Sequence, residues 1–341
     1  MNMNNIRTAI LGYGRSGSTM HAGPIEKIDG FDMVAVCDID PKRRDQASER
    51  FGCTVYEDYH EMLEKEELDL VCVITRNDQH CEMVCDCLNA GANVLVTKPW
   101  AANQSEAERM VSTARKSGKK LLPWLPARWG SELRRLKALR QEDAIGNIFT
   151  IRRTVASFGT RCDWQTESKF AGGYLLNWGP HIVDPPVLLA GGKVKTVFGR
   201  LKQTINPGDV EDLFIAIITM DNGVTVQVEY TISLAPMPGW IAQGDRGTIT
   251  IDGKEMSIVR GEPARPDDPT KFNTMKVDGN ETIKETLAGN AYGDEYEIYK
   301  EIAAAVRGEE DFAVKPEDAL ELSRILDAIR TSSEEDRVVN L

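Results

Sequence analysis

The chain has 341 residues, 41% hydrophobic and 28% charged, and its 41 basic and 53 acidic side chains give a net charge of −12 at pH 7. This length exceeds one ordinary hydrophobic core and favours two domains. The negative charge argues against nucleic acid or an anionic membrane as the main partner. No apolar run reaches the roughly 18 residues that span a bilayer, and no secretory signal precedes the first strand-like run.

The cysteines and histidines lack the spacing of a metal site. Seven cysteines, an odd number in a chain this long, indicate reduced thiols and a cytoplasmic protein. Cys81 and Cys85 would share a helical face, but Cys87 would not, and no second pair has zinc-like spacing. We therefore expect these thiols to pack in the interior, and we expect no bound metal.

Strand and helix signals alternate along residues 1–123. Strand-like runs lie at Ile6–Leu11, Asp32–Cys37, Asp69–Thr75, Asn93–Thr97 and Lys120–Trp124. Amphipathic segments lie between them, notably at Pro41–Phe51, Asp78–Ala90 and Gln104–Ser117. Continuous apolar strands separated by helices are typical of a parallel sheet covered on both faces. We predict an α/β fold in which residues 1–123 form a doubly wound, parallel, dinucleotide-binding domain.

The pattern changes over residues 124–341. Strands are predicted at Ile148–Ser157, Val194–Ile205, Leu213–Met220, Val224–Ile232, Thr248–Ile251 and Met256–Val259. Helices are predicted at Ser131–Glu142, Asp294–Arg307 and Pro316–Ser332, and a surface loop at Glu262–Pro269. Short turns between successive strands imply antiparallel pairing. We therefore predict a C-terminal α+β domain with a mostly antiparallel open sheet.

A glycine-rich turn, Gly12-x-Gly14-x-x-Gly17, follows the first strand and opens a helical segment. In a dinucleotide-binding fold, Gly12 allows the tight turn, Gly14 lets the pyrophosphate approach, and Gly17 lets the helix pack closely. The helix N-terminus then offers N–H groups to the phosphates. We expect Pro24 to kink or restart this helix. The alternative, that the glycines serve turns only, is less favoured because a matching acid follows.

That acid is Asp38, which ends the second strand 21 residues after Gly17. A carboxylate accepts hydrogen bonds from ribose hydroxyls and repels a 2′-phosphate, so the sequence favours NAD. Arg43 and Arg44 follow closely and can accommodate a 2′-phosphate. NADP therefore stays as the less favoured alternative.

Lys98 stands at the end of the apolar run Asn93–Thr97, which Pro99 stops. The carboxyl edge of a parallel sheet is where such folds bind ligands, so Lys98 is a candidate reactive group. The alternative is an ordinary lysine that extends from a strand end into solvent.

A second candidate group lies in the segment Gly172–Asp184. If this segment is helical, Asn177, His181 and Asp184 fall on one face. A histidine can move a proton near neutral pH, although a core histidine bonded to a carbonyl is the alternative. The prolines in this region argue against one uninterrupted helix.

Together these motifs resemble the Gfo/Idh/MocA oxidoreductases, a family named for glucose–fructose oxidoreductase, inositol dehydrogenase and a rhizopine-catabolism protein. The resemblance runs through essentially the whole chain and rests on Gly12–Gly17, Asp38, Ile74–His80, Thr97-Lys98-Pro99, Ala127-Arg128-Trp129 and Gly172–Asp184. It implies a Rossmann domain followed by a domain with a mostly antiparallel sheet, with catalysis between them. It also implies a homodimer or homotetramer assembled through the open face of that sheet.

The chain departs from the family pattern at two positions. Thr97 stands where the family has a glutamate before its lysine and proline, and Asn177 stands where it often has an aspartate before the catalytic histidine. An amide can orient a hydroxyl but cannot act as a base. His181 therefore remains the proposed acid and base, and Asp184 is a further candidate for the missing charge.

The resemblance implies reversible oxidation of a secondary alcohol on a sugar, cyclitol or glycoside. His181 would take the hydroxyl proton, Lys98 would stabilise the same oxygen, and Asn177 would position a neighbouring hydroxyl. The expected cofactor-binding residues are Gly12, Tyr13, Gly14, Arg15, Ser16, Gly17, Asp38, Arg43, Thr75, Asn77, His80, Lys98, Pro99 and Arg128. The expected substrate-binding residues are Lys98, Arg161, Asp163, Trp164, Tyr174, Asn177, His181, Asp184 and Tyr292.

Two other functions stay open. One is an NAD-dependent glycosidase or lyase that oxidises its substrate transiently, with no net cofactor turnover. The other is a non-catalytic sensor that binds dinucleotide. The presence of both Lys98 and His181 argues against the sensor, whereas Asn177 keeps it open.

Overall fold

The computed structural model describes residues 5–263, 268, 270–272 and 277–341. By their internal contacts the residues form two compact units, which we describe separately. The first unit comprises Met1–Pro126, Glu167–Gly172 and Gly293–Asp327. The second comprises Ala127–Thr166, Gly173–Tyr292 and Ala328–Leu341. The predicted division of the chain between residues 123 and 124 stays a prediction.

A parallel sheet of six strands forms the centre of the first unit. In sheet order the strands are β3 (Thr54–Tyr56), β2 (Phe31–Cys37), β1 (Ile6–Leu11), β4 (Leu70–Val73), β5 (Asn93–Val96) and β6 (Leu121–Pro123). Every residue of β4 is fully buried, as expected for a strand covered on both faces. The predicted Rossmann-type α/β fold is confirmed.

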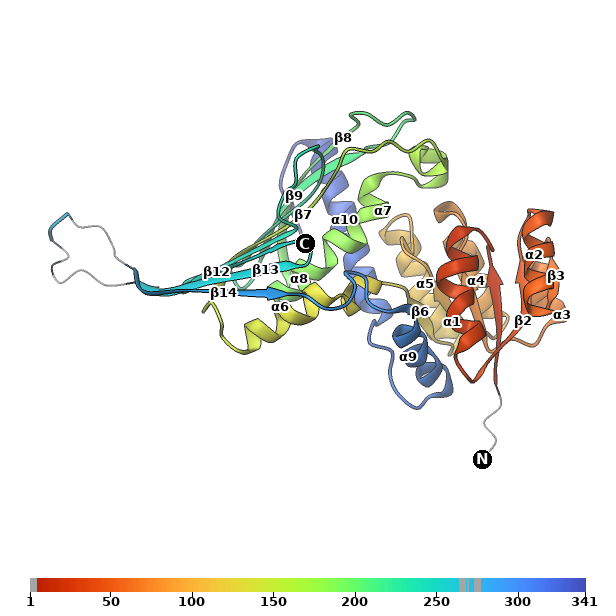
Figure 1. Cartoon of the computed structure of the whole chain (residues 1–341). Coiled ribbons are helices and arrows are strands. Elements are labelled where there is room, and N and C mark those ends of the chain that lie inside the picture. Colours follow the sequence, from red (N-terminus) through yellow and green to blue (C-terminus); the bar gives the residue numbers. More distant parts are fainter. Residues whose placement is uncertain (1–4, 264–267, 269, 273–276) are drawn as a thin grey trace. The chain divides into compact units, whose positions relative to one another are not determined.

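Helices surround this sheet (Figure 1). They are α1 (Ala22–Lys27), α2 (Pro41–Phe51), α3 (Tyr59–Lys65), α4 (His80–Asn89), α5 (Gln104–Ser117), α9 (Glu295–Arg307) and, as far as Asp327, α10 (Pro316–Glu335). Local capping explains why α2 and α5 match their predicted bounds. The Asp40 and Asn103 side chains accept N–H bonds at the two starts, and left-handed glycines follow both ends.

The sequence analysis missed β3 and α3. A strand of three residues and a helix of seven are too short to show a clear hydrophobic period, and α3 buries only Met62. The expected interruption near Pro24 is confirmed: a π-helical turn at Gly17–His21 precedes α1. Pro24 lies in α1 shortly after this π-helical turn, and such a turn is a usual site of helix distortion.

A sheet of nine strands forms the second unit. In sheet order the strands are β14 (Val277–Thr286), β13 (Glu255–Pro263), β12 (Gly247–Asp252), β11 (Trp240–Gly244), β7 (Ile148–Ser157), β10 (Thr225–Ile232), β9 (Leu213–Met220), β8 (Val194–Lys202) and β15 (Val339–Asn340). Only β7 and β10 pair in parallel, so the prediction of a mostly antiparallel sheet is confirmed for the described residues.

Three of these strands, β11, β14 and β15, were not predicted. β14 carries many polar residues and is held in the sheet by pairing with β13. The prediction of a loop at Glu262–Pro269 was wrong at its start, because Glu262 and Pro263 end β13 and pair with β14. Positions 264–267 and 269 of that predicted loop lie outside the described residues.

The helices α6 (Ser131–Gln141), α7 (Tyr174–Ile182) and α8 (Asp184–Ala190) lie on one side of this sheet (Figure 1). Val226, Val228 and Ile218 of the sheet are fully buried in the core of this unit. Ile215 and Ile217 alternate with buried residues on β9 and stay partly exposed on the other face. Among the described residues, no helix is long and apolar enough to cross a membrane.

Candidate active site

The glycine-rich turn lies directly at the carboxyl edge of the six-stranded sheet. Gly12 has a φ of +91°, and a Cβ atom there would lie 2.4 Å from the Ile74 carbonyl oxygen. At Gly17 a Cβ atom would lie 2.1 Å from the Gly12 carbonyl oxygen. At Gly14 the nearest group would be the Arg43 guanidinium at 3.5 Å, an ordinary contact. Side chains are thus sterically excluded from two of the three positions, which fits a turn that cradles a pyrophosphate.

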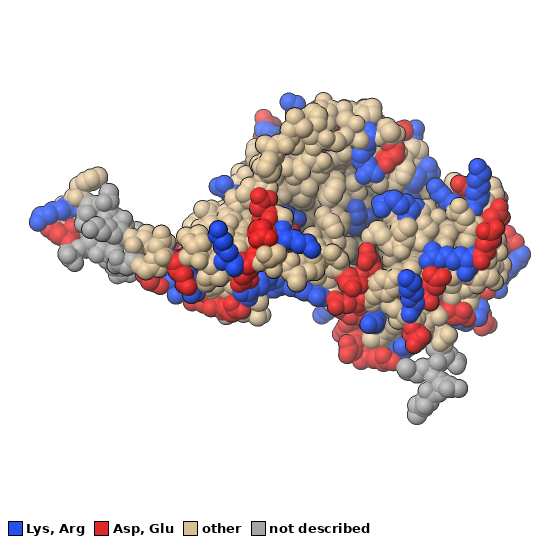
Figure 2. Space-filling model, viewed as in Figure 1, with Lys and Arg blue, Asp and Glu red and all other residues tan. Residues whose placement is uncertain are grey.

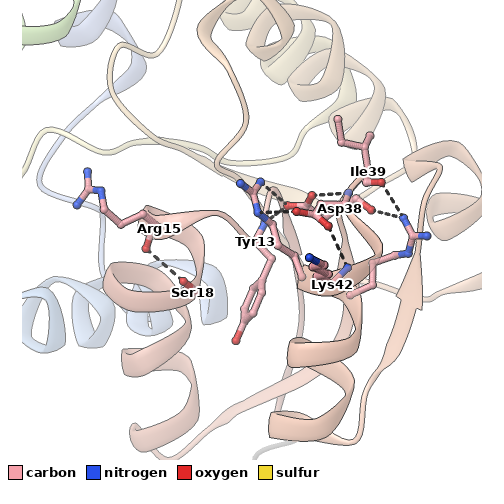
Figure 3. A network of polar contacts seen from close by, with 9 residues as sticks. Tyr13, Arg15, Ser18, Asp38, Ile39 and Lys42 are labelled. Carbon is pink, nitrogen blue, oxygen red and sulfur yellow. Dashed lines mark hydrogen bonds and ion pairs between the residues drawn. The ribbon is translucent and has the colours of Figure 1, made fainter. Parts of the chain in front are cut away.

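Asp38 lies beside this turn, at the end of β2 (Figure 3). Its Oδ2 accepts a hydrogen bond of 2.7 Å from the Tyr13 N–H, and its Oδ1 accepts one of 2.9 Å from the Asp40 N–H. Arg43 Nη1 lies 3.5 Å from the same Oδ2. These contacts fix a buried carboxylate next to the glycine turn, so the residues present fit the adenosine ribose of a dinucleotide.

The neighbouring arginines differ in their contacts. Arg44 donates to the Asp38 and Ile39 carbonyls and pairs with Glu57 at 3.0 Å, so it supports the local backbone. The Arg43 side chain is 46% exposed and lies nearer the carboxylate of Asp38. The Arg15 side chain points away from Asp38 (Figure 3). Of Arg15, Arg43 and Arg44, Arg43 is therefore the best placed to contact a 2′-phosphate.

The loop after β4 carries three further candidates for cofactor binding. The Thr75 hydroxyl lies 3.5 Å from the Met83 sulfur, and Asn77 Nδ2 donates a 2.8 Å bond to the Ala171 carbonyl. The imidazole of His80 lies between the Pro99 and Thr75 carbonyl oxygens. All three side chains thus have partners within the first unit.

Lys98 lies two residues after the end of β5, at the same edge of the sheet. Its flanks are fixed: the Thr97 N–H donates to the Val73 carbonyl at 3.1 Å, and the Trp100 indole N–H donates to the Ser323 hydroxyl at 2.8 Å. The lysine itself is half-buried. The loops after β1, β4 and β5 thus bring the glycine turn, Asn77 and Lys98 to one edge of one sheet.

Asn177 and His181 lie on α7 in the second unit, and both are buried. The expected interruption of this segment is confirmed, because α7 ends at Ile182 and α8 begins at Asp184, whereas Pro180 lies inside α7. The prolines at positions 185 and 186 lack the N–H groups that would continue the helical hydrogen bonds of α7.

Asp184 forms an ion pair with Arg128. Its two carboxylate oxygens accept bonds of 2.9 and 2.8 Å from the Arg128 guanidinium. Both side chains are largely buried, at 6% and 11% exposure. Burial lowers the pKa of the neighbouring Lys137, and the charge of Arg128 lowers it further. A fixed ion pair thus joins a residue expected to bind cofactor with one expected to bind substrate.

Of the remaining candidates for substrate binding, Tyr292 packs against His181, with their ring centroids 4.5 Å apart. Tyr174 is buried and packs edge-on against Tyr230 at 4.7 Å. Arg161 and Asp163 form an ion pair of 2.6 Å, and Trp164 begins a short 3₁₀ turn just after it. Tyr292 is thus the candidate for an aromatic wall beside the histidine.

Sequence analysis missed two acidic residues that support this part of the second unit. Glu211 Oε1 accepts the Leu175 N–H at 2.9 Å and its carbonyl accepts the Tyr174 N–H at 3.0 Å, so it caps α7. Burial raises the pKa of Glu211. Only the adjacency of two acids before an apolar strand signals them in the sequence.

The second of these acids, Asp212, is fully buried and accepts four bonds of 2.7–2.8 Å from Thr204, Ile205 and Asn206. Burial opposes ionisation, but these hydrogen bonds prevail and lower the pKa of Asp212. Asn206 in turn accepts the Arg161 N–H at 2.8 Å. Asp212 therefore orders the loop that holds Arg161.

Comparison with known proteins agrees with this geometry. Residues 6–123 match the family model for the NAD-binding Rossmann fold of the Gfo/Idh/MocA oxidoreductases, and residues 137–341 match the model for the C-terminal alpha/beta domain of that family. The chain belongs to this family.

The chain is similar to curated relatives whose names refer to an inositol and a glucoside. It is 26% identical over 357 residues to scyllo-inositol 2-dehydrogenase (NADP(+)) of Bacillus subtilis (strain 168), with 99% of this chain and 97% of the relative covered. It is 27% identical over 256 residues to D-glucoside 3-dehydrogenase of Escherichia coli (strain K12), covering 69% of this chain and 72% of the relative.

Solved structures share the fold. An NAD-binding protein from Listeria innocua superposes with a TM-score of 0.86 at 24% identity, covering 99% of this chain and all of the other. The WlbA dehydrogenase of Chromobacterium violaceum, solved with NADH and UDP-GlcNAcA, gives a TM-score of 0.83 at 23% identity, covering all of this chain and 97% of the other.

Proposed function

We propose that this oxidoreductase is an NAD(P)-dependent dehydrogenase that transfers hydride between a secondary alcohol of a sugar, cyclitol or glycoside and nicotinamide. The observation that carries the proposal is the placement of Lys98 at the same sheet edge as the glycine turn and Asp38. Membership of the family supports the reaction class, and the named relatives support the substrate class.

Each candidate catalytic side chain has one role in this proposal. His181 takes the proton of the reacting hydroxyl, since imidazole exchanges protons near neutral pH. The ammonium of Lys98 donates a hydrogen bond to the same oxygen and stabilises the charge that develops there. Asn177 orients a neighbouring hydroxyl through its amide. When bound, the nicotinamide supplies the hydride acceptor or donor.

NAD is the proposed cofactor, because the buried carboxylate of Asp38 would repel a 2′-phosphate. Arg43, at 3.5 Å from that carboxylate, offsets part of this repulsion. The relative from Bacillus subtilis is named for NADP, so both dinucleotides belong in the test.

The test is turnover by the purified protein with NAD or NADP and a panel of cyclitols, aldoses and glycosides. We expect reduced nicotinamide to appear with at least one substrate and to be lost in Lys98→Ala and His181→Ala. The exposed Lys116→Ala and His60→Ala are the matched controls and should keep activity. Release of an aglycone without net reduction would indicate the glycosidase or lyase, and dinucleotide binding without turnover would indicate a sensor.

We also propose that a second copy of the chain covers the open face of the nine-stranded sheet. Ile215 and Ile217 are 36% and 43% exposed there. Figure 2 shows acidic and basic side chains interspersed over the first unit. On the open sheet face, Ile215 lies between Arg200 of β8 and Glu229 of β10, and Ile217 lies between Phe198 and Gln227. A partly apolar sheet face is the kind of surface that self-association buries.

A further inference from the structure

His80 is a buried histidine with both ring nitrogens next to backbone carbonyl oxygens. It is the first residue of α4 and has no exposed surface. Its Nδ1 lies 2.8 Å from the Pro99 carbonyl oxygen, and its Nε2 lies 3.2 Å from that of Thr75. The two carbonyls belong to the loops that follow β5 and β4, so the ring lies between neighbouring loops of the candidate site.

The position of the proton on the His80 ring decides which of the two contacts is a hydrogen bond. A carbonyl oxygen only accepts, and a neutral imidazole carries a single N–H, so only one of the two contacts is a full hydrogen bond. Burial lowers the pKa of His80, and this effect outweighs the contacts with the Pro99 and Thr75 carbonyls, which raise the pKa. The neutral ring with its proton on Nδ1 therefore satisfies the shorter contact, to Pro99.

That contact matters because of the chemistry of Pro99. Proline has no N–H, so its carbonyl is its only backbone group that can form a hydrogen bond. Pro99 is buried, and a buried carbonyl without a partner is costly. His80 thus holds the residue that immediately follows Lys98.

We infer that His80 is a positioning residue: it fixes the backbone at Lys98 through Pro99 and does not contact the cofactor. Both of its nitrogens face carbonyls of the protein. The inference rests on the proposed function, in which the ammonium of Lys98 must meet one substrate oxygen. A displacement of about 1 Å at such a group can lower turnover about a hundredfold.

Two isosteric variants separate the two contacts. In His80→Asn, the side-chain amide N–H can take the place of Nδ1 and reach Pro99. In His80→Gln, the longer side chain reaches toward Thr75 instead. We expect kcat within about threefold of the wild type for His80→Asn, and about 10- to 100-fold lower for His80→Gln and His80→Ala, with the KM for the dinucleotide changed little. His60→Asn, at an exposed histidine, is the control.

Hydrogen exchange tests the inference without turnover. The amides of residues 98, 100 and 101 should exchange about tenfold faster in His80→Gln than in the wild type, and at the wild-type rate in His80→Asn. Equal exchange and kcat in the Asn and Gln variants would overturn the inference, even if His80→Ala does not fold. A wild type without activity, but with this exchange pattern, would instead refute the proposed function alone.

Discussion

At the scale of single residues, Asp38 and Arg43 set the charge that the adenosine end of a dinucleotide would meet. The carboxylate is buried and held by two backbone N–H groups, whereas the arginine side chain is 46% exposed and 3.5 Å away. A fixed acceptor suits ribose hydroxyls, and an exposed cation nearby can move to a phosphate. Asp38 should therefore contribute mainly to the affinity for NAD, and Arg43 to the affinity for NADP.

We predict that Asp38→Ala raises the Kd for NAD about 10- to 100-fold, because hydrogen bonds to a charged acceptor are lost. Arg43→Ala should raise the Kd for NADP more than the Kd for NAD. Titration of the purified variants with each dinucleotide measures both effects. An unchanged Kd for NAD in Asp38→Ala would remove the ribose assignment.

The sequence was informative at this scale wherever function depends on local spacing. Gly12 and Asp38 could be assigned roles from their neighbours in the chain alone. The pairing of Arg128 with Asp184 joins residues 56 positions apart. The capping of α7 by Glu211 spans 36 positions. No local pattern reports such pairs, because the fold alone brings them together.

At the scale of elements, the turn after β1 depends on steric room. Gly12 and Gly118 both have positive φ angles, of +91° and +67°. A Cβ atom at Gly12 would lie 2.4 Å from the Ile74 carbonyl oxygen, whereas none of the described atoms lies within 4 Å at Gly118. An alanine would therefore have a strained backbone at either position, but only at position 12 would its Cβ atom also clash with a neighbouring carbonyl.

We predict that Gly118→Ala lowers the free energy of unfolding by about 1–2 kcal/mol, the cost of a left-handed alanine. Gly12→Ala should cost clearly more and should also weaken dinucleotide binding, because β1 and β4 must move apart. Chemical denaturation of both variants measures the difference. Equal losses in the two variants would show that the contact with Ile74 is unimportant.

The start of α7 should carry a pH dependence from Glu211. Burial raises the pKa of this carboxyl in the folded protein, so the folded state disfavours its ionisation. The stabilisation from protonated Glu211 is complete below the pKa of the unfolded chain and is lost as pH rises through the folded pKa. Glutamine keeps the acceptor for Leu175 but cannot ionise.

We therefore predict that Glu211→Gln gains stability relative to the wild type as pH rises from about 4 to about 8. Denaturation at several pH values gives the difference in free energy of unfolding. Glu309→Gln, which removes an exposed carboxylate, is the control. A difference that stays constant with pH would contradict the role given to burial.

Element boundaries were predictable where the chain signals them locally. Capping residues placed α2 and α5, and β1 follows its apolar run. Strands such as β3 and β14 were missed because pairing with neighbours, and not their own composition, holds them in their sheets. The break between α7 and α8 was signalled by prolines, but its position was not.

At the scale of the whole molecule, the open sheet face should govern assembly. Ile217 is exposed on β9 and lies between Phe198 on β8 and Gln227 on β10. We predict that the wild type is a dimer or tetramer in sedimentation analysis and that Ile217→Glu shifts it toward the monomer, because a charge would be buried in the interface. The control Ala313→Glu, at an exposed position of the first unit, should leave the oligomeric state unchanged. A monomeric wild type would refute this assembly.

The central claim is that hydride passes directly between a carbon bearing a hydroxyl and the nicotinamide. The most direct measurement uses a cyclitol or glycoside substrate deuterated at its ring carbons, with mass analysis of the dinucleotide recovered after reaction in ordinary water. We expect one deuterium on the reduced nicotinamide, and none when Lys98→Ala or His181→Ala replaces the wild type. A reduced nicotinamide without deuterium would contradict the claim. Aglycone release with no reduced nicotinamide would instead exclude net dehydrogenation and indicate transient oxidation of the substrate.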